Sequence, residues 1–507
     1  MENKGYGAHV LALPYPSQGH INPMLHFSKR LASKGLRATF ATTHFIYKTF
    51  QPEPSDSVQF DTISDGYDEG GFYQSESIHD YLTRLEDNGS KTLANLIMKY
   101  KELGHPIDCL VYDAFLPWAL DVAKQFGLVA VPFFTQACAV NFIYYYTHHG
   151  LLQLPVSSTP VSIPGMPLLE LQDMPSFIYV NGSYPAYFEM VLRQFSNTDK
   201  ADWIVVNTFY KLEAEVVDAM SKICPLLTIG PTVPSKYLDN RVKNDNRYGL
   251  NLFTLESSIN IINWLDTKPA GSVIFVSFGS MANLSNKQME ELALGFKGSN
   301  YYFLWVVRDS EEAKLPKTFV EDIGERGMVV NWCPQMEVLS HKAIGCFFTH
   351  CGWNSTVEAL SLGVPMVGMP QWTDQTTDAK FVQDVWKVGI RVKVDENGIV
   401  GREEIEFCIR EVMEDGYNEG GFHQSESLHA YLTRLKAIGS KTSAELIKKY
   451  NPLASKGVRA TFAITHFIFK TMQPKSSASV QFDTKYQMAI MRVAFTNRRV
   501  SMPISLV

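Results

Sequence analysis

The sequence predicts an α/β protein with two Rossmann-like domains, each built on a parallel sheet. Apolar runs of strand length alternate with helical patterns in both halves of the chain, which is typical of strand–helix–strand units. The 507 residues are enough for two substantial cores. A polar stretch without periodicity, residues 235–250, separates the halves and is expected to be exposed. We therefore predict a first domain over 1–234, a linker over 235–262 and a second domain over 263–414.

Composition limits the possible functions. The net charge of −6 and the absence of a basic block argue against a nucleic-acid partner. Seven scattered cysteines show no metal-ligand spacing and are typical of free thiols in a reducing compartment. We see no secretory signal and no apolar run of about 18 residues, so we expect a cytoplasmic protein without a membrane span.

The first domain begins with a strand–turn–helix–strand unit. Residues 9–14 form an apolar run, 16–20 a turn, 22–33 a helical pattern that Gly35 ends, and 37–43 a second strand. His20 lies just after the first of these strands. Ligands collect at the carboxyl ends of strands in such sheets, so His20 is a candidate site residue.

Asp113 is the predicted partner of His20. It follows an apolar strand at 109–112 and precedes a helical pattern, which places it at the same edge of the sheet. A neutral imidazole can take a proton from a hydroxyl or a carboxylic acid, and a carboxylate can stabilise the imidazolium that forms. A helix-capping aspartate beside a structural histidine fits the spacing equally well.

The remainder of the first domain contains fewer signals. A polar loop is expected at 65–77, a helix from His79 onward, and another strand at 203–207. Residues 133–148 are dense in Phe and Tyr, which is usually core, although part of this stripe could line an apolar acceptor pocket. The loop at 154–173 could overhang that pocket.

The second domain shows strands at 272–278, 301–307 and 327–331. The first of these ends in Gly279-Ser280, where a backbone N–H and a hydroxyl could meet a phosphate. A further strand at 346–349 leads through a turn at 350–354 into a helix from Ser355 to Gly363, and another strand follows at 365–369.

The start of that helix predicts an anion site. Free backbone N–H groups and the positive end of the helix dipole face any anion placed there, and His350, Asn354 and Ser355 add side-chain donors. A diphosphate would fit without a lysine or a metal. Ser355 and Glu358 also match a capping box, which needs no ligand, and His350 alone could be a core histidine.

Neighbouring residues fit the rest of a sugar nucleotide. Trp332 could stack on a flat base, although a lone Trp is more often core. Glu358 could accept hydrogen bonds from two ribose hydroxyls, and Asp374 with Gln375 could bind hydroxyls of a hexose.

The stretch 332–375 resembles the signature of plant family-1 UDP-glycosyltransferases. Trp-Cys-Pro-Gln opens it, His-Cys-Gly-Trp-Asn-Ser stands at its centre, and Asp-Gln closes it, all at the family spacing. The resemblance implies a GT-B fold, with uracil on Trp332, ribose on Gln335 and Glu358, diphosphate on His350, Asn354 and Ser355, and sugar on Trp353, Asp374 and Gln375. With Ser280, Cys333 and Thr135, these residues form the expected donor site. A closing Gln is associated in the family with glucose.

Residues 14–23 match the family's amino-terminal pattern Pro-x-Pro-x-Gln-Gly-His-x-x-Pro, whose histidine is the base. This resemblance favours the catalytic interpretation of His20 and Asp113. Thr135 matches a family position that touches the donor sugar. The amino-terminal stretch is most similar to the subgroup that glucosylates carboxylic acids such as salicylate, and some terpenoids.

We therefore expect inverting transfer of glucose from UDP-glucose, the donor substrate, to a hydroxyl or carboxyl of a small apolar plant metabolite. No cofactor, metal, nucleic acid or membrane is expected, and we expect a monomer. The alternative is a catalytically impaired protein that binds UDP-sugar without turnover. An NAD-dependent oxidoreductase is disfavoured because the first turn lacks GxGxxG.

The end of the chain contains shuffled repeats. Residues 415–450 repeat 65–100 with about 26 of 36 positions identical, and 453–484 repeat 31–62 with about 25 of 32 identical. Neither copy includes the strand before His20, so the copies bring no second site. We interpret 415–507 as a fusion with part of a related gene or an error in the gene model, and expect it to pack poorly because its parent sheet is missing.

Overall fold

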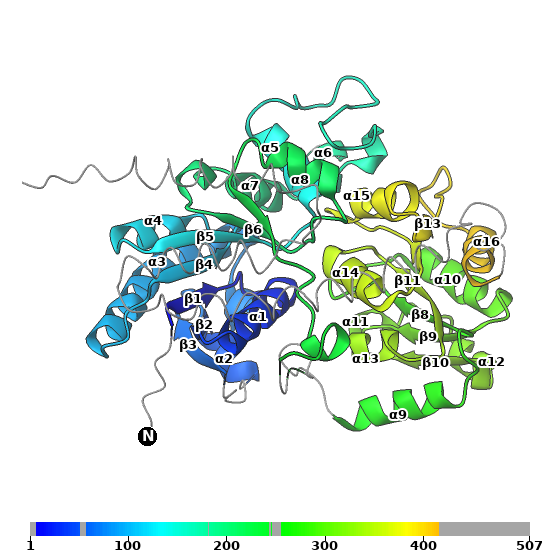
Figure 1. Ribbon diagram of the computed structural model, residues 1–507. Coiled ribbons are helices and arrows are strands. Elements are labelled where there is room, and N and C mark those ends of the chain that lie inside the picture. The colour runs from blue at the N-terminus through cyan, green and yellow to red at the C-terminus, as the bar shows by residue number, and fades with distance from the viewer. Residues whose placement is uncertain (1–6, 51–56, 181, 243–244, 246–254, 415–507) are drawn as a thin grey trace, which may run out of the picture.

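The protein contains two parallel sheets that lie side by side, each covered by helices (Figure 1). The structure is a computed structural model, and it describes residues 7–50, 57–180, 182–242, 245 and 255–414. The prediction of two Rossmann-like α/β domains is confirmed. The predicted repeats at 415–450 and 453–484 lie outside the described residues.

The first sheet has the strand order β3-β2-β1-β4-β5-β6-β7, and all its strands are parallel. Its strands are β1 (His9–Leu13), β2 (Arg37–Thr43), β3 (Val58–Ile63), β4 (Cys109–Asp113), β5 (Val129–Phe134), β6 (Ile204–Val206) and β7 (Leu226–Thr228). The helices of this half are α1 (Gln18–Ser33), α2 (His44–Phe50), α3 (Ile78–Glu102), α4 (Trp118–Gln125), α5 (Cys138–His148), α6 (Ser176–Tyr179), α7 (Pro185–Arg193) and α8 (Ala214–Met220).

Alternation along the strands explains the layers of this half. Val10 and Ala12 of β1 pack with α1 on one face, whereas Leu11 and Leu13 pack with α3 and α4 on the other. Successive strand residues point to opposite faces, and in β1 the residues from Val10 to Leu13 are apolar on both faces. Such a strand must be covered by helices on both sides, and β1 indeed lies inside the sheet, between β2 and β4.

The second sheet has the order β10-β9-β8-β11-β12-β13, again all parallel. Its strands are β8 (Val273–Ser277), β9 (Tyr302–Val306), β10 (Gly327–Val330), β11 (Ile344–Thr349), β12 (Met366–Gly368) and β13 (Gly389–Arg391). The helices are α9 (Leu255–Asp266), α10 (Asn286–Gly298), α11 (Asp309–Glu312), α12 (Phe319–Ile323), α13 (Gln335–Leu339), α14 (Trp353–Leu362), α15 (Gln375–Lys380) and α16 (Arg402–Met413).

Each sheet has one point where the strand order reverses, between β1 and β4 in the first and between β8 and β11 in the second. At such a point the loops after two neighbouring strands leave in opposite directions and open a crevice at the carboxyl ends of the strands. His20 and Asp113 flank the first of these points. Gly279 and His350 flank the second.

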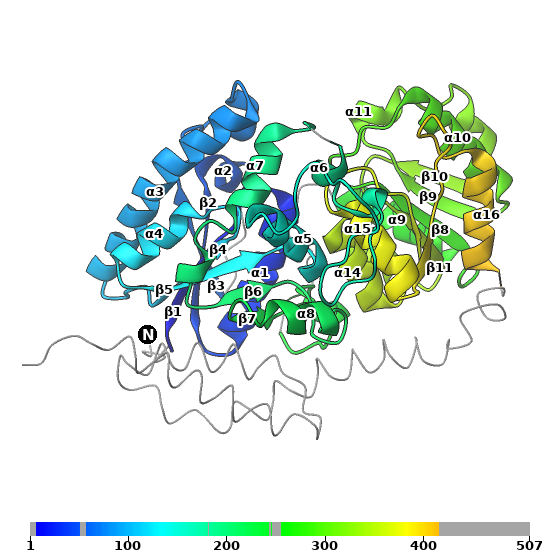
Figure 2. The same ribbon diagram turned by 90° about the horizontal axis from the view of Figure 1, so that it is seen from above.

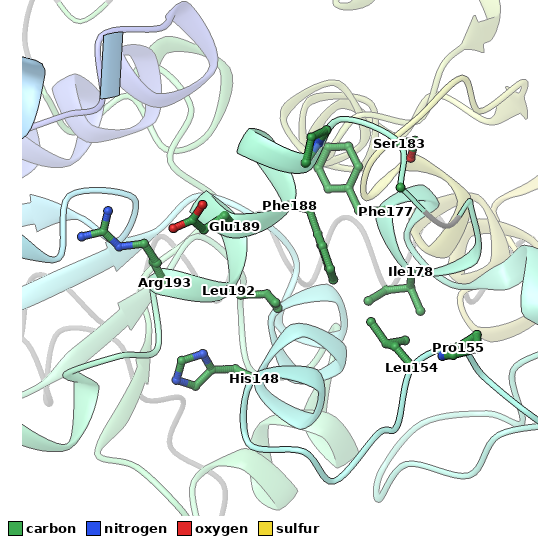
Figure 3. Close-up of a pocket in the computed structure, with 12 residues that line it drawn as sticks. His148, Leu154, Pro155, Phe177, Ile178, Ser183, Phe188, Glu189, Leu192 and Arg193 are labelled. Atoms are coloured by element: carbon green, nitrogen blue, oxygen red, sulfur yellow. The ribbon is translucent and has the colours of Figure 1, made fainter. Parts of the chain in front are cut away.

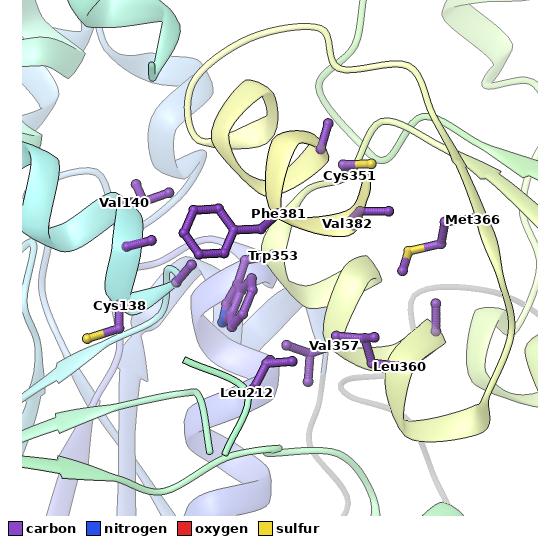
Figure 4. Close-up of a cluster of buried hydrophobic side chains, with 14 of the residues drawn as sticks. Cys138, Val140, Leu212, Cys351, Trp353, Val357, Leu360, Met366, Phe381 and Val382 are labelled. Atoms are coloured by element: carbon purple, nitrogen blue, oxygen red, sulfur yellow. The ribbon is translucent and has the colours of Figure 1, made fainter. Parts of the chain in front are cut away.

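A hydrophobic cluster joins the two halves. Cys138, Val140 and Leu212 of the first half pack into the same cluster as Trp353 and Phe381 of the second. Figure 4 shows the Trp353 and Phe381 rings turned toward the helix that carries Cys138 and Val140. The shared interior fixes how the two strand edges face each other.

The predicted linker is not uniformly exposed. Ser235 is fully buried and Asp245 nearly so, because this segment packs on α1. The Lys29 ammonium lies 2.9 Å from an Asp245 carboxylate oxygen, and the Arg30 guanidinium lies 3.1 Å from Asp239. The expectation of exposure is wrong for Ser235 and Asp245: Asp245 pairs with Lys29 of the first domain, and the Ser235 N–H in turn donates to the Asp245 carboxylate at 2.7 Å. In addition, α9 begins within the range predicted as linker.

Two helix starts differ from expectation in a way that affects the site. Helix α1 begins at Gln18, so His20 lies in the first turn of the helix rather than in the turn before it. Helix α14 begins at Trp353, two residues before the predicted start, and ends where Gly363 takes a left-handed conformation with φ of 72°. Ser355 therefore lies inside the first turn, not at the cap.

Candidate functional site

His20 and Asp113 form a hydrogen-bonded pair at the first switch point. The Nδ1 atom of His20 lies 2.8 Å from Oδ2 of Asp113, and Oγ1 of Thr135 lies 3.1 Å from the same Nδ1. The Asp113 side chain is 1% exposed and the His20 side chain 16%. A proton on Nδ1, between two oxygens, leaves Nε2 as the basic nitrogen.

The carboxylate of Asp113 is itself held in place. Its Oδ1 accepts a hydrogen bond of 3.0 Å from the backbone N–H of Phe115, so the loop after β4 fixes the carboxylate that fixes the imidazole. Rings of Tyr15 and Phe115 flank His20, with centroids 5.3 Å and 4.8 Å from the imidazole. An acceptor that reaches Nε2 must therefore pass aromatic surface.

His350, at the second switch point, is enclosed by two glycines. A Cβ added at Gly279 would lie 2.7 Å from Nε2 of His350, and one added at Gly352 would lie 2.6 Å from it. Gly279 also has φ of +72°, which L side chains rarely adopt. These two positions therefore require glycine if the imidazole is to lie against the start of α14.

The His350 ring does not carry the positive charge that many anion-binding side chains have. Burial lowers its pKa from 6.5 to about 4, and a hydrogen bond to the Ser277 backbone opposes this only in part. The ring is neutral at pH 7 and can donate one hydrogen bond, but it adds no positive charge. The first-turn N–H groups and the dipole of α14 remain as the favourable electrostatic contribution to an anion at this point.

Gln335 links the start of α13 to α14. Its Nε2 donates to Oγ of Ser355 at 2.9 Å and to Oε2 of Glu358 at 2.7 Å. The cap of α14 is Gly352, with no side-chain cap, so Ser355 and Glu358 do not form the capping box that the sequence also allowed. The structure thus brings Gln335 and Glu358, the two residues predicted to bind ribose, together with Ser355.

The two switch points meet through one hydrogen bond. Asn354 of α14 donates from Nδ2 to the backbone carbonyl of Gly19 at 2.6 Å, and Gly19 immediately precedes His20. The start of α1 and the start of α14 therefore face each other across the boundary between the domains. The candidate base and the candidate anion site belong to one location.

Asp374 is the N-cap of α15 and Gln375 is its first residue, whereas Ser280 lies in the loop after β8. Oε1 of Gln375 accepts from the backbone N–H groups of Gln371 and Trp372 at 2.9 Å and 3.1 Å, while Asp374 accepts from the Thr373 hydroxyl. The loop of Ser280 is held by Arg308, whose Nη1 lies 2.6 Å from the Ser280 carbonyl and whose Nη2 donates to Ala282.

Two predicted side chains are directed into the core. The Trp353 indole is 3% exposed, and its Nε1 donates to the Asn207 carbonyl at 2.7 Å. That N–H is therefore engaged, and a sugar contact by Trp353 would have to come from its backbone. Cys333 is buried in the same cluster, and burial raises the pKa of its thiol. Trp332 is half-buried.

The predicted aromatic stripe is mostly core. Phe133, Phe134, Phe142 and Tyr144 are at most 1% exposed, so the expectation that part of the stripe lines a pocket fails for these four. A cavity of about 360 Å³ does lie beside the end of α5 (Figure 3). Its lining is mainly apolar and comprises His148, Leu154, Pro155, Phe177, Ile178, Gly182, Ser183, Pro185, Phe188, Glu189, Leu192 and Arg193. None of the predicted catalytic or donor residues lines it.

Several site residues make contacts that a pattern of side chains does not predict. Gly19 and Asn207 act through their backbone carbonyls, which any residue possesses. Ser176 and Asp173, from a loop of the first domain, bind the segment that carries Asp374 and Gln375. Gly279 did carry a signal, because a glycine directly after a predicted strand indicates that another group approaches the backbone closely.

Comparison with known proteins places the chain in a family. The profile described as UDP-glucoronosyl and UDP-glucosyl transferase matches residues 72–430, and that of a glycosyltransferase N-terminal domain matches 7–51. UDP-glycosyltransferase 74F2 of Arabidopsis thaliana is 59% identical over 418 residues, which is 82% of this chain and 91% of the relative. This chain belongs to the family-1 UDP-glycosyltransferases.

Two further comparisons describe where the chain lies among the UDP-glycosyltransferases. Flavonol 7-O-beta-glucosyltransferase UGT74F1 of Arabidopsis thaliana is 56% identical over 410 residues, which is 80% of this chain and 89% of the relative. The crystal structure of Os79 from O. sativa in complex with UDP matches with a TM-score of 0.79 and 40% identity, over 90% of this chain and 100% of Os79. The fold is GT-B, and the activity class of the UDP-glycosyltransferases is hexosyl transfer.

Among the described residues of this UDP-glycosyltransferase, no helix is long and apolar enough to cross a membrane. In the same ranges, no group of three or more His, Cys, Asp or Glu side chains is arranged to hold a metal ion.

Proposed function

We propose that this chain transfers glucose from UDP-glucose to a hydroxyl or carboxyl group of a small apolar plant metabolite, with inversion at the anomeric carbon. The observation that carries the proposal is the hydrogen bond of 2.6 Å between Asn354 and the Gly19 carbonyl. It supports one shared site, because it puts the helix start suited to a diphosphate next to the turn that carries His20.

The proton transfer begins at His20. Nε2 takes the proton of the acceptor O–H while the acceptor oxygen forms a bond to the anomeric carbon of the sugar. Asp113, 2.8 Å from Nδ1, stabilises the imidazolium that results. An acceptor that is already an ionised carboxylate needs no proton transfer, and then His20 contributes by position.

Departure of UDP completes the step. The bond between the anomeric carbon and the diphosphate oxygen breaks, and its electron pair leaves with UDP. Negative charge develops next to the first turn of α14, where backbone N–H groups and Ser355 can meet it, with neutral His350 beside them. Attack from the face opposite UDP gives a β-glucoside or a β-glucose ester.

The acceptor is proposed to lie against aromatic side chains of the first domain. Tyr15 and Phe115 flank His20, and Tyr187 lies near enough to Tyr15 to help raise its pKa, an effect caused mainly by burial. The Tyr187 ring lies 5.7 Å from that of Trp372, in the loop before Asp374. A flat apolar acceptor fits such a wall, since offset and edge contacts with aromatic rings are favourable.

Names of the relatives support the donor and the type of acceptor. UGT74F1 is described as a flavonol 7-O-beta-glucosyltransferase, and Os79 was solved with UDP bound. Both match this chain over most of their length. The closing Gln375 agrees with glucose as the transferred sugar.

The proposal can be tested with the purified full chain. It is incubated with UDP-glucose and a panel of acceptors, which comprises phenols, flavonols, terpenoid alcohols and aromatic acids. We expect UDP release coupled to a β-linked product, identified by the anomeric proton coupling in NMR. UDP-glucose binding by a folded sample, without product from any acceptor, would instead support the impaired binding protein as the alternative.

A further inference from the structure

A short segment of the first domain, residues 173–176, binds the start of α15 and the loop before it, which carry the residues proposed to bind the sugar. Thr377 Oγ1 donates to the Asp173 carbonyl at 2.8 Å, and Thr376 Oγ1 donates to the Met174 carbonyl at 2.6 Å. Lys380 lies 3.2 Å from the buried Asp173 carboxylate. Figure 2 shows the two elements involved, α6 and α15, next to each other at the boundary of the domains.

The centre of this contact is Thr373, whose backbone is strained. Its φ of 52° lies in the left-handed region, which is costly for a β-branched residue, by about 1–3 kcal/mol. Such a conformation persists only where neighbouring groups impose it. The residue after Thr373 is Asp374, so the direction of the Asp374 backbone depends on this conformation.

Ser176 of the first domain supplies the groups that hold Thr373. The Thr373 N–H donates to Oγ of Ser176 at 2.7 Å, and the Ser176 N–H donates to the Thr373 carbonyl at 2.8 Å. Both backbone polar groups of the strained residue are therefore satisfied by one serine, which is 6% exposed. The next residue, Phe177, packs its ring edge-on against Trp372 at 5.9 Å.

The hydrogen bonds around Thr373 also involve Asp374 and Gln375, the two residues proposed to bind the sugar. The Thr373 hydroxyl donates to Oδ1 of Asp374, and Gln375 accepts from the N–H of Trp372 at 3.1 Å. A change in the Thr373 backbone would therefore move both Asp374 and Gln375. The protein groups proposed to bind the diphosphate belong to a different element, α14, and would keep their positions.

We propose that Ser176 is a positioning residue for the donor sugar: by fixing the left-handed Thr373, it aims Asp374 and Gln375 at the sugar hydroxyls. This inference rests on the proposed function, because that function assigns the sugar to Asp374 and Gln375. It makes the first domain, which carries the base, a determinant of sugar binding as well.

The proposal can be tested without turnover by measuring two binding affinities. Calorimetry on the full chain gives the affinity for UDP-glucose and the affinity for UDP. In Ser176→Ala, the N–H of Thr373 loses its acceptor, and we expect UDP-glucose to bind about tenfold more weakly while UDP affinity changes less than twofold. Ser176→Thr keeps the hydroxyl and should restore most of the loss. Ser340→Ala removes an exposed serine hydroxyl that bonds only within α13 and its cap, and serves as the matched control.

Three results would overturn the inference: unchanged affinity for both ligands, equal weakening of both ligands, or failure of Ser176→Thr to restore UDP-glucose binding. Equal weakening would indicate a general structural role. Wild-type protein that binds UDP-glucose more tightly than UDP but forms no product would contradict the proposed function alone, and the comparison of the two ligands would still decide the role of Ser176.

Discussion

The two switch points of the molecule each present a histidine at the start of a helix, but the groups around the two rings differ. At the first, His20 follows β1, and the end of β4 supplies the carboxylate of Asp113 at 2.8 Å. At the second, His350 follows β11, and the loop after β8 supplies Gly279, which has no side chain and lies directly against the imidazole.

This difference separates two chemical roles at equivalent places in the fold. A carboxylate stabilises an imidazolium, which suits a group that must accept a proton and hold it during the reaction. A glycine lining removes water without adding charge, and burial lowers the pKa of His350 to about 4. The neighbour across the switch point, rather than the histidine itself, decides whether the ring is a base or a neutral donor.

Removal of the proposed base should give the largest effect. His20→Ala is expected to lower kcat at least about a hundredfold with a hydroxyl acceptor, because the proposed base is removed. UDP affinity should change little, since the groups proposed to bind the diphosphate belong to α14. Steady-state kinetics and calorimetry on the same preparation measure both quantities. His79→Ala, an exposed histidine on α3, is the control, and turnover retained by His20→Ala would remove His20 from the mechanism.

Loss of the charge on Asp113 should have the next largest effect. Asp113→Asn keeps the size of the side chain but cannot stabilise the imidazolium in the same way, so we expect kcat to fall about thirtyfold. The decrease should be larger for hydroxyl acceptors than for carboxylic acids, which are ionised at neutral pH. An equal decrease for both classes of acceptor would show that Asp113 acts through local structure instead.

The second histidine should influence binding and not proton transfer. His350→Gln removes a hydrogen bond and packing at the start of α14, and we expect UDP affinity to fall about tenfold. Because the His350 pKa is about 4, this factor should stay constant between pH 6 and 8. A factor that grows as the pH falls toward 6, measured by calorimetry, would mean that the ring becomes cationic.

The smallest expected effect concerns stability in acid. The folded-state pKa of His350, about 4, lies below its ordinary value of 6.5, so its contribution to stability is complete above pH 6.5 and is lost as the pH falls toward 4. We expect the loss between pH 7 and pH 5 to be on the order of 1 kcal/mol. Urea unfolding of the ligand-free protein at pH 7 and pH 5 should therefore show less acid destabilisation for His350→Gln than for wild type or His79→Ala. Parallel curves for all three proteins would contradict this expectation.

Much of this arrangement could be predicted from the sequence, because it depends on local patterns. Apolar runs indicated the strands next to both switch points, and the order of His350, Asn354 and Ser355 before an apolar helix indicated the candidate anion site, which stays a prediction. His20 and Asp113 could be paired because the carboxyl ends of parallel strands meet at one edge of a sheet.

The features that sequence reasoning missed depend on tertiary contacts. The segment that contains Ser235 and Asp245 is held on α1 by the ion pairs of Asp245 with Lys29 and of Asp239 with Arg30, which no local pattern encodes. The orientation of the Trp353 indole toward Asn207 depends on how the domains pack. The role of Ser176 depends on a partner 197 positions away in the chain.

The hydrophobic cluster shared by the two halves limits how the enzyme can exchange its substrates. Separating the halves as rigid bodies would expose Trp353, Phe381 and their neighbours to water, at about 25 cal/mol for every Å² of apolar surface. Substrate entry and product release should therefore rely on small loop and side-chain movements around the rim. In a calorimeter, the two halves should melt together, because unfolding of either half would expose the shared cluster to water even though each half also has clusters of its own.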